Sequence, residues 1–245
     1  MRMAMSFLAF LVPLAGTAIG APETGETVPA GPPVQKTIVR GTVPADLPGR
    51  WMAVGWVELP GDRDRTVPSL WEVTRENGQP VLTVRFAQLP PELTKALADA
   101  NNAEKKWMPQ PGDLARLAAA WDSLPTVDVD MVSVDNEIVG RDAFDGSFKR
   151  EPKTTDAAWA IRQSERFHPR AGGAMQTINV YGVLEPRDGG YFGNFTTATI
   201  VAAPLPIPIT LNGTFQMYRI AGDETGESGG FFARLMDTLR GCGRR

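Results

Sequence analysis

The chain has 245 residues, of which 42% are hydrophobic and 22% are charged, with a formal net charge of −3 at pH 7. These values are typical of a globular protein with one large β domain or two small ones, and the weak acidity argues against nucleic acid as a partner. The only cysteine, Cys242, excludes an intramolecular disulfide, so the core must hold the fold.

The N-terminus has the pattern of a secretory signal peptide. Arg2 precedes an apolar run over residues 3–15, which Pro13 interrupts, and small residues follow up to Ala21. This run is shorter than the roughly 20 apolar residues of a membrane span. We therefore expect residues 1–20 to be a signal peptide and the protein to be exported, to the bacterial periplasm or outside the cell. Residues 21–35, rich in proline and glycine, are expected to be a disordered leader.

Residues 36–221 have the pattern of a single, mainly β domain. Residues 52–59 are apolar enough for a buried strand, and strands at 70–74 and 81–86 flank the turn signal Asn77-Gly78. Two helices are predicted at about residues 90–124, because prolines stand where first helical turns accept them and Asp113 can cap the second helix. We expect this helical insertion to cover one end or face of a sheet.

Alternating apolar and polar residues return at 127–134, and Asp135-Asn136 has the composition of a turn. Residues 155–167 fit either a short helix or a strand. Strands are predicted again at 177–184 and 191–203. The total is eight or nine antiparallel strands, which fits either a barrel or a sandwich.

The second Asn-Gly pair, Asn212-Gly213, predicts a two-residue hairpin turn. In the resulting register Pro204, Pro206 and Pro208 do not need to bond the partner strand, but they prevent a regular strand on their other side. The sequence therefore predicts an edge strand here.

Residues 222–245 are expected to be a flexible acidic linker followed by an amphipathic helix. Its apolar stripe consists of Phe231, Phe232, Leu235, Met236 and Leu239. This helix either docks on its own domain or binds a membrane surface or a protein partner. Cys242, near its end, is either incidental or a site of modification or pairing.

No catalytic, cofactor or metal motif is recognisable. His168 is the only histidine, which excludes multi-histidine metal sites and limits catalytic arrangements that need an imidazole. Between residues 128 and 145 the acidic residues are Asp128, Asp130, Asp135, Glu137, Asp142 and Asp145. They could bind a hard cation such as calcium, but outward-facing charges on a half-buried strand give the same pattern.

Gly49-Arg50-Trp51 opens the first long strand and precedes a β-meander. This segment resembles the Gly-x-Trp that opens the first strand of lipocalins. The resemblance covers these three residues and, more loosely, the β architecture. It implies that Trp51 plugs the closed end of a barrel that holds a ligand.

Two functions from different classes are favoured over a third, an enzyme, which would have to rely on carboxylates, arginines, tyrosine or His168 without a recognisable arrangement. The first is an exported protein that binds an apolar, lipid-like ligand in or at the edge of a β-barrel. The residues expected to line this site are Trp51, Trp56, Trp107, Trp121, Phe192, Phe195, Leu205, Ile207 and Tyr218. The second is a structural or protein-interaction domain of the cell envelope, without a ligand cavity.

Overall fold

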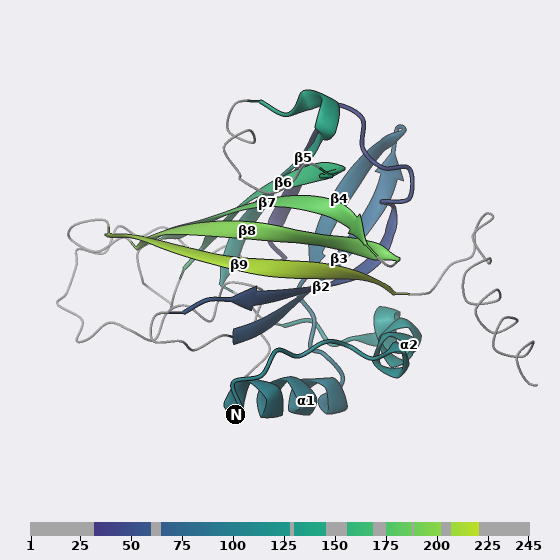
Figure 1. Cartoon of the computed structure of the whole chain (residues 1–245), viewed down its shortest axis with the longest axis vertical. Helices are drawn as coiled ribbons and strands as arrows, with labels where there is room; N and C mark the ends of the chain where they lie inside the picture. The colour runs from purple at the N-terminus through teal and green to yellow at the C-terminus, as the bar shows by residue number, and fades with distance from the viewer. Residues whose placement is uncertain are drawn as a thin grey trace, which may run out of the picture.

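The protein is described here from a computed structural model, which covers residues 32–59, 65–127, 130–145, 156–168, 175–187, 189–201 and 207–220 and omits the side chains of 199–209. Its strands are β1 (Val34–Arg40), β2 (Gly49–Val57), β3 (Arg65–Glu76), β4 (Gln79–Arg85), β5 (Met131–Gly140), β6 (Trp159–Phe167), β7 (Gln176–Arg187), β8 (Gly190–Val201) and β9 (Ile207–Ile220). They form one sheet, curled into a nearly closed barrel (Figure 1). The expected signal peptide and tail helix lie outside the described residues.

The order of strands around the barrel is that of an up-and-down meander with one insertion. Strands β2, β3 and β4 are neighbours in chain order, and so are β5 to β9. The two runs are joined by β9, which pairs antiparallel with β2. The first strand, β1, occupies the place between β4 and β5 and pairs in parallel with β5. The prediction of one mainly β barrel or sandwich is thus confirmed in the form of a barrel, although one pairing is parallel.

The seam between β1 and β4 is closed by side chains, because these two strands share no backbone ladder in the described sheet. The Gln35 amide donates to the carbonyl of Val84 and accepts from its N–H, both at 2.7 Å. The Thr37 hydroxyl makes the same pair of bonds with Leu82, both at 3.0 Å. Both side chains therefore satisfy backbone groups at the edge of β4.

Two helices within the predicted insertion pack on the outside of the barrel: α1 (Pro91–Asn102) and α2 (Pro111–Ala120) (Figure 1). Each begins with proline, whose missing N–H costs nothing in a first turn. The sequence predicts Asp113 as the N-cap of α2, but the structure places Asp113 at the third helical position. The cap is Gln110, and Asp113 accepts its N–H at 2.9 Å. None of the helices in the described ranges is long and apolar enough to cross a membrane.

The two Asn-Gly pairs have different structures. Asn77 and Gly78 have φ of 51° and 80° and form the predicted turn between β3 and β4. The hairpin predicted at Asn212-Gly213 is wrong, because β9 continues through both residues and pairs with β8 on one side and with β2 from Gly213 onward. A Cβ on Gly213 would lie 2.3 Å from the carbonyl oxygen of Trp56. This glycine therefore allows close backbone approach within a strand.

One of the prolines predicted to form an edge strand belongs to a different arrangement. Pro208 pairs with Ile200 of β8, at a point of β9 before its pairing with β2 begins. Pro204 and Pro206 lie outside the described residues. The register predicted for this region is therefore wrong.

A second predicted turn is also part of a strand. β5 continues through Asp135 and Asn136, and the Asn136 side chain points inward, where it is buried and donates to the carbonyl of Leu82 at 3.1 Å. Residues 155–167, which fit either a short helix or a strand, contain the strand β6. Its inward positions alternate, as expected for a barrel strand.

Candidate functional site

Aromatic side chains fill one half of the barrel interior. They are Trp51, Trp71, Trp159, Tyr191, Phe195 and Phe215, which are all buried in the main core. The ring of Tyr191 is centred 5.6 Å from the rings of both Trp51 and Trp159, and Phe195 lies 6.0 Å from Phe215. We call this set the aromatic half. It provides a large apolar surface at one end of the barrel.

The segment between β1 and β2 closes the end at which the aromatic half lies. Trp51 Nε1 donates to the carbonyl of Leu47 at 2.8 Å. The guanidinium of Arg219 lies over the Trp51 ring and donates to the carbonyls of Pro48 and Asp46. The Tyr191 hydroxyl donates to the Asp46 carboxylate at 2.6 Å, and burial together with this bond raises the pKa of Tyr191. Trp51 is thus fixed at a closed end.

Polar side chains occupy the inner face of the neighbouring strands β5 to β8. This polar belt consists of Asn136, Gln163, Glu165, Gln176 and Thr197, all buried. Asn136 pairs across the strands with Gln163, and both Gln163 and Thr197 pair with Val180. Glu165 follows Gln163 on the same face of β6. The belt therefore spans four adjacent strands at neighbouring levels of the barrel.

Hydrogen bonding within the polar belt is incomplete. Gln163 Nε2 donates to Glu165 Oε1 at 3.2 Å. Four buried atoms have no hydrogen-bond partner among the described residues: Asn136 Oδ1, Glu165 Oε2, Gln176 Oε1 and Thr197 Oγ1. Buried polar atoms are normally paired, since an unpaired one loses its bond to water without replacement. The belt can therefore accept further hydrogen bonds inside the barrel.

Glu165 is the only carboxylate among the buried residues of the described part, which include no lysine or arginine. Its side chain is 1% exposed, and burial raises the pKa of the carboxyl to about 7. His168, three residues further along the chain, is also buried, and its backbone N–H donates to the carbonyl of Asp130 at 2.8 Å. The belt thus carries one carboxyl group poised between its two protonation states near neutral pH.

The predicted lining residues separate into two groups. Trp51 and Phe195 belong to the aromatic half. Trp56, Trp107 and Trp121 belong to an outer cluster between the sheet and the helices, and Phe192 and Tyr218 are partly buried against it. Leu205 lies outside the described residues, and the side chain of Ile207 is not described. The barrel wall therefore separates the two interior residues from the other five.

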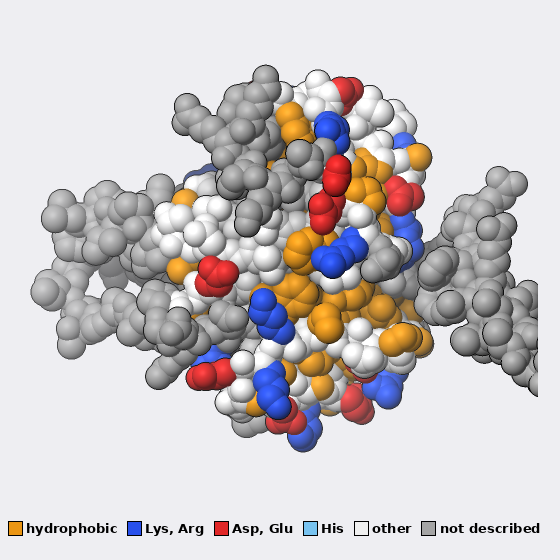
Figure 2. Space-filling model, viewed as in Figure 1, with side chains coloured by type: hydrophobic (Ala, Val, Ile, Leu, Met, Phe, Trp, Pro, Cys, Tyr) orange, Lys and Arg blue, Asp and Glu red, His pale blue; other side chains and the backbone are white. Residues whose placement is uncertain are grey.

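The outer cluster is packed by the helices and stabilised by cations. The guanidinium carbons of Arg50 and Arg85 both lie over the Trp121 ring, 5.4 and 5.0 Å from its centre. Trp56 Nε1 donates to the carbonyl of Trp107 at 3.2 Å. Figure 2 shows hydrophobic side chains in the middle of the face turned to the viewer, near the positions of β9 and α2 in Figure 1. These contacts attach the helical insertion to the barrel.

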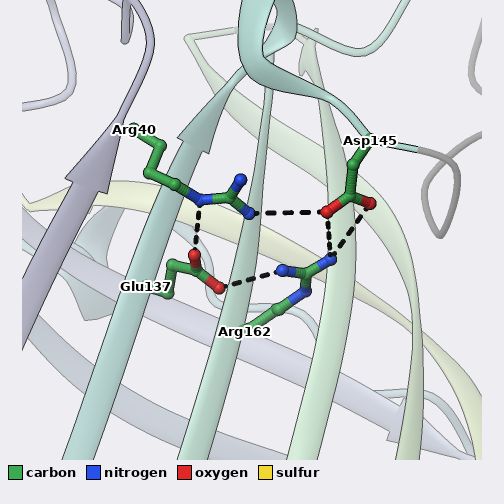
Figure 3. A network of polar contacts seen from close by, with 4 residues as sticks. All are labelled: Arg40, Glu137, Asp145 and Arg162. Atoms are coloured by element: carbon green, nitrogen blue, oxygen red, sulfur yellow. Dashed lines mark hydrogen bonds and ion pairs between the residues drawn. The ribbon is translucent and has the colours of Figure 1, made fainter.

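Two of the acidic residues take part in an ion-pair network outside the barrel (Figure 3). Glu137 binds Arg40 at 2.6 Å and Arg162 at 3.1 Å, and Asp145 binds Arg162 at 3.3 Å and Arg40 at 3.7 Å. Asp142 instead accepts bonds from the N–H and hydroxyl of Thr42, which lower the pKa of its carboxyl. Asp128 lies outside the described residues. These contacts connect β1 to β5 and β6.

The polar belt could have been found in the sequence. On β6 the inward residues Trp159, Ile161, Gln163, Glu165 and Phe167 alternate with outward ones. This period of two indicates a strand whose buried face carries an amide and a carboxyl. The sequence pattern does not by itself single out these residues, because residues 155–167 fit a short helix as well as a strand.

Comparison with protein families, curated proteins and solved structures gives no significant match to this chain. The geometry of the barrel is therefore the evidence on function.

Proposed function

We propose that the protein is an exported binding protein that holds a lipid-like small molecule non-covalently inside its barrel. The observation that carries this proposal is the polar belt, with four buried polar atoms that lack partners beside an aromatic half. Barrels of about eight strands are wide enough to enclose one small ligand. A molecule with an apolar body and a polar end would match both regions.

The energetic reason is the cost of unpaired polar atoms. Each buried donor or acceptor without a partner costs about 1–3 kcal/mol. A ligand that bonds to Asn136, Gln176 or Thr197 would offset this cost, while its apolar part would gain from contact with aromatic rings. The belt is thus more useful to a binding protein than to a barrel that serves only as a scaffold.

The position of Trp51 supports the lipocalin-like form of this proposal. It follows Gly49 at the start of β2, lies inside the barrel and is covered by the preceding segment. Gly49 has φ of 146°, and a Cβ there would lie 2.5 Å from the Arg219 guanidinium. A glycine at position 49 is therefore favoured by its backbone conformation, which L side chains rarely adopt.

Native mass spectrometry of the protein from its own host tests the proposal. We expect a co-purifying molecule of lipid-like mass, which is released by denaturation and returns on refolding with the extract. An empty protein that also fails to bind hydrophobic dyes would contradict the proposal and favour an envelope interaction domain. N-terminal sequencing of the exported fraction tests the signal peptide, since cleavage should remove residues 1–20.

A matched pair of variants locates the site. Thr197→Phe adds a ring to the polar belt, whereas Ala198→Phe adds the same ring on the outer face of the same strand. We expect only the first to reduce dye binding, by about tenfold or more, because it occupies space inside the barrel. Equal loss in both variants would place the dye elsewhere.

A further inference from the structure

The polar belt has a chemical bias that limits the kind of ligand it can bind. Its unpaired atoms at Asn136, Glu165 and Gln176 are all oxygens that accept hydrogen bonds. The Asn136 amide nitrogen already donates to the carbonyl of Leu82. The remaining unpaired atom, the Thr197 hydroxyl oxygen, can both donate and accept. Acceptor oxygens therefore outnumber donors among the unpaired atoms of the belt.

The charge of the buried Glu165 carboxylate also favours a ligand that donates hydrogen bonds. The buried residues of the described ranges include no lysine or arginine that could compensate Glu165. An ionised carboxylate in this position is stable only with a cationic or strongly donating partner. A ligand carboxylate or phosphate would instead meet a like charge and several lone pairs.

Glu165 is also oriented for such a contact. Its Oε1 is held by the Gln163 amide, which leaves Oε2 as the unpaired atom. The neighbouring inward positions on β5 and β7, Val134 and Ile178, are apolar and offer no competing bond. One carboxyl oxygen is thus fixed and the other remains available.

We infer that the barrel ligand carries an amino group on an apolar body, and that Glu165 Oε2 binds this group. This inference rests on the proposed function and specifies the class of its ligand. The ammonium form is a charged donor, which is the kind of partner that a buried carboxylate oxygen requires. Below about pH 7, amine binding converts a neutral Glu165 into a carboxylate, and the proton released goes to solvent.

Three probes with the same alkyl chain distinguish the possible head groups: decylamine, decanol and decanoate. Binding to the full-length mature protein is measured by titration calorimetry at about pH 8, where a carboxyl with a pKa near 7 is mostly ionised. We expect decylamine to bind at least about tenfold more tightly than decanol, and decanoate to bind most weakly. Decanol or decanoate as the tightest probe would overturn the inference and leave the proposed function intact. Binding of none of the three would overturn both.

Glu165→Gln keeps the size of the side chain and removes its charge. We expect decylamine affinity to fall about tenfold, to the level of decanol, while decanol affinity stays the same. Glu185→Gln is the control, because it makes the same chemical change at a residue of β7 that is not buried. A retained amine preference in Glu165→Gln would overturn the inference.

The wild-type protein provides a test that does not depend on a variant folding. Decylamine affinity should rise about tenfold per pH unit up to about pH 7 and then level off, while decanol affinity stays flat. His168 is a buried histidine three residues after Glu165, so the slope is also measured in His168→Gln, where it should persist. A flat profile for decylamine in the wild-type protein would contradict the role of Glu165.

Discussion

The guanidinium carbon of Arg219 lies 4.3 Å from the centre of the Trp51 ring and so joins the last strand to β2 at the closed end of the barrel. The same side chain donates to the carbonyls of Pro48 and Asp46. One residue thus holds both the plug and the segment that covers it.

Replacing Arg219 with alanine should therefore lower the free energy of unfolding by about 1–3 kcal/mol, through loss of the cation–π contact and of bonds to two carbonyls. Arg187→Ala is the control, since Arg187 covers Phe192 at 4.7 Å outside the barrel. We expect a loss of at most about 1 kcal/mol there. Urea unfolding of both variants measures the difference, and equal losses would mean that the two carbonyl bonds add nothing.

The two Asn-Gly pairs should respond differently to alanine. In Gly213→Ala the new Cβ would lie 2.6 Å from the Phe195 ring as well as against the Trp56 carbonyl, so we expect a loss of about 3 kcal/mol or more. In Gly78→Ala nothing lies within 4 Å and the cost comes only from φ of 80°, about 1 kcal/mol. Thermal unfolding checks the order, and a larger loss at Gly78 would contradict the strand assignment at Gly213.

The β1/β4 seam predicts a local change in hydrogen exchange. Gln35→Ala removes both partners of the Val84 backbone, so the Val84 amide should exchange faster by about tenfold or more. Lys36→Ala is the control, because Lys36 is exposed on the same strand. Exchange followed by NMR should show no change at Val84 in the control. An unchanged Val84 rate in Gln35→Ala would mean that solvent access is limited by another group.

Stability of the ligand-free protein should depend on pH through Glu165. The pKa of its carboxyl is about 7 in the folded protein and near 4.5 in the unfolded chain, so between these values only the folded state keeps the proton. The free energy of unfolding therefore falls as pH rises through this window, by roughly 3 kcal/mol, and levels off above it. Urea unfolding of wild type and Glu165→Gln at several pH values tests this, since the variant should lack the decrease.

The ion-pair network around Glu137 should contribute modestly to stability. Its side chains are a quarter to half exposed, so Glu137→Gln should cost about 1 kcal/mol at low salt. The difference from wild type should shrink in molar salt because the charges are screened. Asp122→Asn is the control, since Asp122 pairs with Arg50 but its side chain is 80% exposed. A loss at Glu137 that salt does not reduce would indicate hydrogen bonding in place of charge.

Much of the fold could be predicted from local patterns. The turn at Asn77-Gly78 and the two helices depend on short-range preferences, and the structure confirms them. The errors at Asn136 and Gly213 have one cause: residues typical of turns were placed inside strands by contacts with distant segments, at Leu82 and Trp56. Such contacts cannot be derived from neighbouring residues in the chain.

The candidate site was harder to predict than the fold. Large aromatic residues suggested a lining, but at Trp56 and Trp121 they pack outside the barrel under the helices. Which face of a strand points inward depends on the barrel as a whole, because a shift by one residue exchanges the two faces. The more informative residues were polar ones on an alternating face, such as Gln163 and Glu165.

The insertion of β1 between β4 and β5 has a consequence for the order of folding. Arg40 and Glu137, which join β1 to β5, are 97 residues apart in the sequence. The other eight strands can pair with neighbours in chain order and with each other through β9 and β2, whereas β1 must wait until β5 exists. Until then β4 and β5 present two unpaired edges, at which strands of other molecules can add. The strand synthesised first is thus expected to complete the barrel last, and variants that delay its arrival should aggregate during refolding even where the native state is stable.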